Sequence, residues 1–210
     1  GIAMRWWQKV ALWLMLISGV FWETVLLTYV IFPIFVVKDG LTRASGLPFG
    51  RLYHNYVQLM AYLQLPWIPK LHMLDFTDSV SGATHFADVR KLFIFDIVVF
   101  LLTVIPGVRT WRQLTRRRER WQMVRSFQIG AVVPVVLGAL MAVNFNAVFI
   151  RFHEVLFRND DWLFDPAVDP IINVLPEDFF SACFAIALLG FEAVMIYGIW
   201  RGRKDARGSK

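Results

Sequence analysis

The sequence predicts an all-α integral membrane protein, with four transmembrane helices in a single membrane domain that takes in residues 1–210. Two observations predict this fold class. Hydrophobic residues make up 57% of the chain and charged residues only 18%, whereas soluble domains hold about 45–50% and about 25%. In addition, four stretches are long and apolar enough for a helix to cross a bilayer, which takes about 20 residues. They are 10–37, 92–108, 127–150 and 179–200.

The composition also excludes several classes of protein. A chain this apolar is neither intrinsically disordered nor an ordinary soluble enzyme. Its one cysteine, Cys183, excludes a disulfide framework and a metal site built from several cysteines. The first stretch, 10–37, is longer than a signal-peptide core and no small-residue cleavage site follows it, so we expect a retained membrane anchor.

Three ionisable residues fall inside the predicted spans: Glu23, Asp96 and Glu192. A charge within a bilayer is costly, so such residues usually face the interior of a helix bundle or water. We therefore expect these three to face the bundle interior or water. Hydrogen bonding between helices and a polar wall for a substrate are both open as their role.

The basic residues are concentrated on one side of the predicted membrane. Of 22 basic residues, 14 lie before the first span, between the second and third, or in the tail that ends at Lys210, with only Glu119 and Asp205 as acids beside them. By the positive-inside rule, both termini and the loop 109–126 are predicted to be cytoplasmic. The run Arg116–Arg118 is then a determinant of topology, so the net charge of +6 predicts no nucleic-acid partner.

Two loops, 38–91 and 151–178, are consequently predicted to be extracytoplasmic and to form a site at the outer membrane face. They hold 8 basic and 11 acidic residues. They also hold all four histidines of the chain, which are His54, His72, His85 and His153. The concentration of titratable groups in these loops favours chemistry on this side.

The long outer loop contains a predicted amphipathic helix at 55–63. Val57, Met60 and Ala61 follow the i, i+3, i+4 spacing of one helix face. We expect that face to lie on the membrane surface. Pro66 ends the helix, because proline cannot continue the hydrogen-bond pattern.

The second outer loop includes the segment 157–170, which combines acids, turn formers and aromatic residues. Asp165-Pro166 and Asp169-Pro170 favour turns, and Trp162 and Phe164 suit the depth of the lipid head groups. The pattern predicts a re-entrant or surface hairpin that forms the wall of a site.

His85 and His153 are the candidate catalytic residues. His85 lies just before the second span and His153 just after the third. Since the second span runs inward and the third runs outward, both belong to the same membrane face. Two imidazoles at one place suit acid/base chemistry near neutral pH, although each ring could instead only hydrogen-bond a loop carbonyl. Asp88, three residues after His85, is placed to orient its ring.

Two longer sequence blocks resemble those of a known family. The first is Gly82–Arg90 (GATHFADVR), and the second is Phe152–Pro166 (FHEVLFRNDDWLFDP) followed by DPII at 169–172 and LPEDFF at 175–180. Together they resemble the lipoprotein intramolecular transacylase family, Lit, of Gram-positive bacteria. The resemblance runs from Met4 to about Trp200 and includes the layout of four spans.

This resemblance implies the activity. Members of that family act on bacterial lipoproteins whose N-terminal cysteine carries an S-diacylglyceryl group and a free α-amine. They move the sn-2 acyl chain to that amine, which gives the lyso-form lipoprotein. The resemblance implies that His85 and His153 are the family's two histidines, that no cofactor or metal is needed, and that the partners are the diacylated lipoprotein and the lipids of the cell membrane.

The residues suit this chemistry. Donor ester and acceptor amine belong to one molecule, so positioning can replace an enzyme nucleophile. We expect His85 to be the base and His153 its partner, with the reverse assignment open. Glu154 either orients His153 or faces water, and Arg151 either pairs with a polar head group or extends to the interface. The residues that bind the substrate are not identified by the sequence.

Two other functions remain open at this point. Histidines and carboxylates such as Asp88 and Glu154 also suit zinc, so a metal-dependent membrane hydrolase is one alternative. The other is a non-enzymatic component of membrane assembly or transport, in which Glu23 and Glu192 would be the functional residues.

Overall fold

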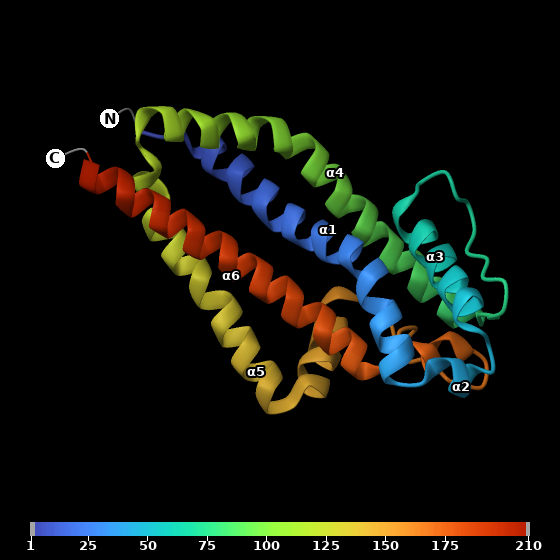
Figure 1. Cartoon of the computed structure of the whole chain (residues 1–210). Coiled ribbons are helices and arrows are strands. Elements are labelled where there is room, and N and C mark those ends of the chain that lie inside the picture. The colour runs from blue at the N-terminus through green and yellow to red at the C-terminus, as the bar shows by residue number, and fades with distance from the viewer. Residues whose placement is uncertain (1–2, 209–210) are drawn as a thin grey trace. The chain divides into compact units, whose positions relative to one another are not determined.

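The computed structural model describes residues 3–208, so Lys210 of the basic tail lies outside the described residues. Within that range every regular element is helical, which confirms the all-α prediction. The elements are α1 (Trp6–Lys38), α2 (Leu41–Ser45), α3 (Phe49–Gln64), α4 (Val80–Arg117), η1 (Arg120–Met123), α5 (Val124–Leu156), η2 (Pro170–Val174) and α6 (Glu177–Gly208) (Figure 1).

Four helices are long and apolar enough to cross a membrane, as predicted: Trp6–Lys38, Val80–Arg117, Arg120–Leu156 and Glu177–Gly208. Each extends past the apolar stretch that identified it. The 38 residues of α4 measure about 57 Å at 1.5 Å per residue, against about 30 Å of bilayer hydrocarbon. Hydropathy marks only the part of a helix at membrane depth, so it does not identify the first turns of α4, which carry His85, as part of the helix.

Helix α5 is interrupted at Asn144. Its backbone angles there are φ −159° and ψ 92°, outside the helical region. The side-chain oxygen of Asn144 accepts a hydrogen bond from the backbone N–H of Ala147 at 3.0 Å, as a helix N-cap does. The third predicted span, 127–150, therefore contains two helical pieces, and the second piece carries His153.

The chain forms two compact units, and α1, α4, α5 and α6 each contribute a segment to both. Unit 1 contains the chain up to Thr24, Asp96–Val143 and the chain from Phe184 onward. Unit 2 contains Val25–Phe95 and Asn144–Cys183. The single membrane domain predicted from the sequence stays a prediction.

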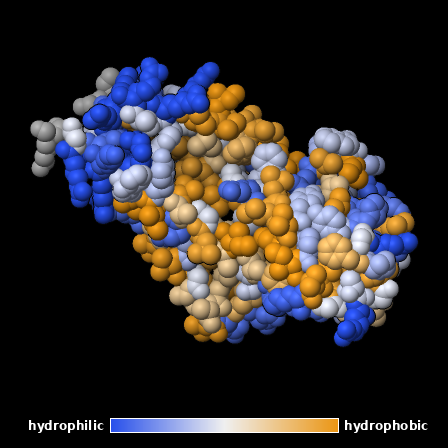
Figure 2. Space-filling view, in the orientation of Figure 1, coloured by the Kyte–Doolittle hydropathy of each residue, from blue (hydrophilic) through white to orange (hydrophobic). Residues whose placement is uncertain are grey.

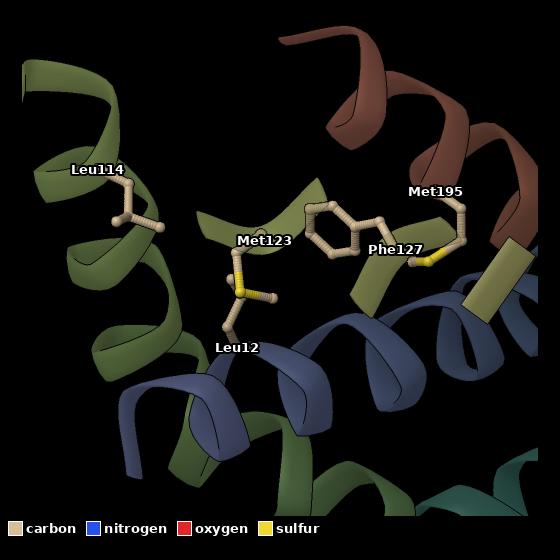
Figure 3. Packing of buried hydrophobic residues seen from close by; sticks show 5 residues of the cluster. All are labelled: Leu12, Leu114, Met123, Phe127 and Met195. Atoms are coloured by element: carbon tan, nitrogen blue, oxygen red, sulfur yellow. The ribbon is translucent and has the colours of Figure 1, made fainter. Parts of the chain in front are cut away.

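The core of unit 1 is a cluster of buried side chains contributed by α1, α4, η1, α5 and α6. Its members are Leu12, Leu114, Met123, Phe127 and Met195 (Figure 3). Around them, Trp13 packs edge-to-face on Phe127 with 5.6 Å between ring centroids. Burial of these apolar groups holds together segments that are far apart in the sequence.

One end of unit 1 collects the start of α1, the turn between α4 and α5, and the last turns of α6 (Figure 1). The backbone N–H of Met4 donates to Oε1 of Gln122 at 2.9 Å. Arg120 and Asp205 form a buried ion pair, with Nε–Oδ2 and Nη2–Oδ1 distances of 2.7 Å each. Hydrophilic side chains gather over this end (Figure 2). The segments that the charge pattern assigned to one side of the membrane thus lie together.

Large apolar side chains remain exposed along the four long helices. Leu102 is 73% exposed, Val30 66% and Ile196 57%. An exposed apolar surface of this kind suits contact with lipid. Glu23 is also exposed, so it does not face the bundle interior, whereas Asp96 and Glu192 are half-buried.

In unit 2, α3 confirms the predicted helix but not its predicted environment. Tyr56 is buried, stacks on Phe32 with 4.1 Å between ring centroids, and meets Phe179 edge-to-face at 6.2 Å. The buried side of α3 is therefore covered by protein. Its members are Leu52, Asn55, Tyr56, Leu59, Met60, Tyr62 and Leu63. The predicted membrane face was wrong because a broader apolar stripe, centred on Tyr56 and Leu59, packs inward.

The connection from α3 to α4 is fastened to α3 by Asp75. The Asp75 carboxylate forms an ion pair with the Arg51 guanidinium, whose Nε donates to Oδ2 at 3.0 Å. The same carboxylate accepts a hydrogen bond from Nδ2 of Asn55 at 2.7 Å. In return, the Asp75 N–H donates to Oδ1 of Asn55 at 2.9 Å. These bonds fix the path by which the chain reaches the first turn of α4.

Hydrogen bonds from Arg51 and Asn55 hold the pKa of Asp75 below its usual value. The stabilising contribution is therefore present above the ordinary carboxyl pKa of about 3.9 and is lost as the pH falls through the lower, folded-state pKa. We predict that Asp75→Asn speeds amide hydrogen exchange at Leu74 and Asp75 at pH 7. An unchanged exchange rate at both amides would show that the ion pair does not hold this connection.

The Arg120–Asp205 pair generates a second prediction. Asp205→Ala leaves a charged guanidinium buried without its partner, which costs about 3–5 kcal/mol. We expect the free energy of unfolding in detergent micelles to fall by that order. Arg203→Ala, at an exposed position of the same helix, is the control and should change it little. Equal effects of the two variants would contradict the proposed importance of the buried pair.

Candidate active site

His85 and His153 lie side by side in unit 2. Their ring centroids are 5.8 Å apart, and each residue is 8% exposed. His85 comes from the second turn of α4, and His153 from the piece of α5 that Asn144 caps. The structure thus brings together the two histidines that the antiparallel order of the spans assigned to one face.

Aromatic rings surround the pair. His85 meets Phe157 edge-to-face at 4.9 Å and Phe164 at 5.5 Å. His153 lies 4.9 Å from the Trp162 ring and also contacts Phe149 at 4.2 Å. The predicted hairpin over 157–170 therefore forms a wall of the site. Burial in apolar surroundings disfavours the charged form of an imidazole, so these contacts favour two neutral rings.

The two rings differ in their hydrogen bonding. Nδ1 of His153 lies 2.8 Å from the backbone oxygen of Phe149. A carbonyl can only accept, so Nδ1 carries the proton and Nε2 of the neutral ring has a free electron pair. Nδ1 of His85 is buried and has no hydrogen-bond partner in the described part of the chain. The alternative in which each ring only hydrogen-bonds a backbone carbonyl therefore applies to His153 at Nδ1, but not to Nδ1 of His85.

Asp88, which the sequence places near His85, forms its hydrogen bonds with other residues. Asp88 accepts from Nζ of Lys91 at 2.9 Å and from Nδ2 of Asn159 at 3.2 Å, and no hydrogen bond joins it to His85 within residues 3–208. The geometry does not support an orienting role for Asp88.

The exposed side of α5 next to the pair carries an ion pair of its own. Nη1 of Arg151 donates to Oε2 of Glu154 at 2.9 Å, and the Arg151 side chain is 82% exposed. Glu154 is therefore paired with Arg151 and not with His153, whose Nδ1 bonds the Phe149 carbonyl. Of the two alternatives for Glu154, the structure favours the one in which it does not orient the ring.

The chain that follows α5 is anchored along the face of α4 that carries His85. Ser81, His85 and Asp88 stand at i, i+4 and i+7, so they share that face. Oγ of Ser81 donates to Oδ1 of Asp161 at 2.6 Å, and Asn159 bonds Asp88 as described above. Sequence reasoning missed Asn159 and Asp161 because only the fold brings them to α4.

The start of α4 is held by Asp169, a residue only 2% exposed. Its Oδ1 accepts from the Ser79 N–H and its Oδ2 from the Ser79 hydroxyl, both at 2.7 Å. The same hydroxyl accepts from the Gly82 N–H at 3.0 Å, which caps the first turn. A Cβ on Gly82 would lie 2.2 Å from Oδ1 of Asp169. Glycine is thus needed at 82 for the carboxylate to approach, one turn before His85.

In residues 3–208, no three histidine, cysteine, aspartate or glutamate side chains are grouped so that they could hold a metal ion. The zinc hydrolase alternative therefore gains no support from the arrangement of the side chains around His85 and His153.

Comparison with known proteins identifies the family. The family model described as lipoprotein intramolecular transacylase Lit matches residues 7–180. The chain belongs to the Lit family. Membership of this family confirms the prediction of an enzyme, an acyltransferase that acts within lipoproteins, and rules against the alternative of a non-enzymatic membrane component. No curated protein sequence matches the chain.

Solved Lit structures have the same fold. The Lit transacylase from Bacillus cereus is 24% identical, with a TM-score of 0.84 over 96% of this chain and 95% of that chain. Two variants of the B. cereus protein, with a histidine replaced by arginine or alanine, are 22% and 23% identical. Each has a TM-score of 0.75 over 96% of this chain and 92% or 93% of theirs. The prediction of a multi-pass membrane protein is thereby confirmed.

The contact between Asp169 and the first turn of α4 can be tested by a substitution at Gly82. In Gly82→Ala the new methyl group displaces the buried Asp169 carboxylate from Ser79, and the first turn shifts with it. Since a misplacement of about 1 Å can cost about 100-fold in rate, we predict a loss of acyl transfer up to that order in protein that still folds. Gly50→Ala is the control, because its Cβ would meet nothing within 4 Å. Full activity of Gly82→Ala would show that the Asp169 contact does not position the site.

Proposed function

We propose that this Lit protein moves the sn-2 acyl chain of a diacylated lipoprotein to the α-amine of its N-terminal cysteine, with His85 and His153 as catalytic residues. The observation that supports this most directly is the pair of buried imidazoles 5.8 Å apart. Two proton-transfer groups at one place suit an amine that must lose a proton and an alcohol that must gain one.

His85 is the base in this proposal. The carboxylates of Asp88 and Asp161 lie near enough for their charge to act on its ring, and this charge stabilises the imidazolium that forms when the ring accepts a proton. Its Nδ1 has no competing partner among the described residues.

His153 acts as the partner through Nε2. Because Nδ1–H is engaged with the Phe149 carbonyl, the neutral ring offers an electron pair at Nε2 and no proton there. It can therefore accept a hydrogen bond from the substrate amine and direct the nitrogen lone pair at the ester.

The proton and bond changes balance without an enzyme nucleophile. The amine gives a proton to His85, and its nitrogen attacks the ester carbonyl carbon. When the tetrahedral intermediate collapses, the bond between that carbon and the glyceryl oxygen breaks. His85 returns its proton to this oxygen. An amide and a free glycerol hydroxyl result.

The proposed orientation puts both termini and the arginine-rich turn in the cytoplasm, with the histidine pair at the outer face of the cell membrane. The concentration of 14 of 22 basic residues in these segments supports it. The contacts of Met4 with Gln122 and of Arg120 with Asp205 support it as well, because they gather the same segments at one end of unit 1. Lipoproteins of the outer leaflet would then reach the site from the lipid.

The test is mass spectrometry of the N-terminal lipopeptide of a lipoprotein co-expressed in a host without N-acylation of its own. We predict an N-acyl, mono-O-acyl cysteine at unchanged total mass. Loss of a general base costs about 10²–10⁴-fold, so His85→Asn and His153→Asn should each leave the substrate almost unconverted. A lipopeptide with distinct chains at sn-1 and sn-2 reports which one moves.

His54→Asn serves as the matched control, because His54 lies on α3 and makes no ring contact with the pair within residues 3–208. It should retain activity. Product formation by the His85 and His153 variants would refute the assignment of the site, and migration of the sn-1 chain would refute the proposed regiochemistry.

A further inference from the structure

Asp161 presents a carboxylate with no cationic partner beside the histidine pair. Within residues 3–208, its carboxylate has one hydrogen bond, from the Ser81 hydroxyl to Oδ1 at 2.6 Å, and no ion pair. Asp88, on the other side of His85 along α4, forms an ion pair with Lys91, with 2.9 Å between Oδ1 and Nζ. The negative charge of Asp161 is thus uncompensated where that of Asp88 is not.

The position of this carboxylate is fixed relative to His85. Ser81, which holds Oδ1, precedes His85 by four residues on the same face of α4. The charge of Asp161 acts on the His85 ring. The segment 159–161 is attached at both ends, to Ser81 and to Asp88, so the carboxylate is held at a position one helical turn from His85.

A second, independent observation, the unpaired Nδ1 of His85, also points to a bound ligand at this place. It is more than nine-tenths buried, yet its Nδ1 has no partner among the described residues. A buried polar atom without a hydrogen bond is unfavourable, and the structures of proteins normally provide a partner for it. A donor from a bound molecule would complete this site.

We propose that Asp161 binds the α-ammonium group of the substrate's N-terminal cysteine and delivers it to His85. This inference rests on the proposed function. An ammonium group has three N–H donors and a positive charge. Asp161 supplies the opposite charge and an acceptor, and His85 supplies a second acceptor. One N–H bond then breaks, its proton forms the N–H bond of the His85 imidazolium and passes from there to water, and the electron pair stays on the nitrogen. The neutral amine and neutral His85 that result are the starting point of the acyl transfer described above.

The test uses purified protein and a synthetic diacylated lipopeptide with a free amine. Asp161→Asn keeps an oxygen for the Ser81 hydroxyl and removes the charge. A charge-assisted hydrogen bond to the ammonium group is lost, so KM should rise about tenfold. The value of kcat should fall as well, because the charge no longer stabilises the His85 imidazolium. The N-acetylated lipopeptide carries no cation and cannot react, and its inhibition constant should be the same for the variant and the parent.

Asp160→Asn is the matched control. Asp160 is the adjacent exposed acid and its side chain has no hydrogen bond or ion pair within the described residues. It should leave KM and the inhibition constant unchanged.

Two outcomes would overturn the role of Asp161. One is an unchanged KM for the free amine in Asp161→Asn. The other is an equal weakening of the N-acetylated inhibitor, which would mean that Asp161 only shapes the site. Failure of the proposed function is distinguished by His85→Asn, since retained activity in that variant would refute the catalytic assignment itself.

Discussion

The contact between Asp169 and the first turn of α4 is the constraint on which the geometry of the site depends. The carboxylate binds both the backbone and the hydroxyl of Ser79, and that hydroxyl caps Gly82. Once this turn is fixed, the helical repeat determines where His85 points. The same stretch of chain supplies the Trp162 and Phe164 rings against the two histidines. One connection therefore sets both the direction of the His85 ring and the apolar walls around it.

The walls and the acids have opposite effects on the histidines. Packing of aromatic rings against His85 and His153 disfavours their charged forms, which keeps a lone pair available for a proton. A base that is only desolvated would resist the imidazolium that it must form. In the proposed reaction, the carboxylates at the His85 edge of the pair reduce that cost. The arrangement suits an acyl transfer in which the substrate brings its own nucleophile, because the protein needs to orient groups and move one proton.

Much of this could be predicted from the sequence, and the reasons for the misses are physical. Four apolar stretches of sufficient length specify four helices, and their alternating direction places His85 and His153 together. Hydropathy averages over many residues, so it passed over the single side chain of Asn144 that interrupts α5. Helical spacing identified α3 but not what covers it. The Asp169 contact joins residues 90 apart in sequence, and only the path of the loop determines it.

The hydrogen bonds of Asp88 do not support its predicted role in orienting His85, for a reason that bears on the substrate. Helical spacing places Asp88 near His85, but it does not show which other side chains bind that carboxylate. Lys91 lies one turn further along the same helix and forms an ion pair with Asp88. Arg151 pairs with Glu154 in the same way on α5. Acids with a base three residues away on a helix are neutralised locally. Asp161 lies in a non-helical turn, where Arg158, three residues earlier, forms no ion pair with it among the described residues, so its charge remains available to an incoming cation. The two loops hold 11 acidic and 8 basic residues. Because Asp88 and Glu154 are paired with bases, the unpaired negative charge that acts on His85 within residues 3–208 is that of Asp161.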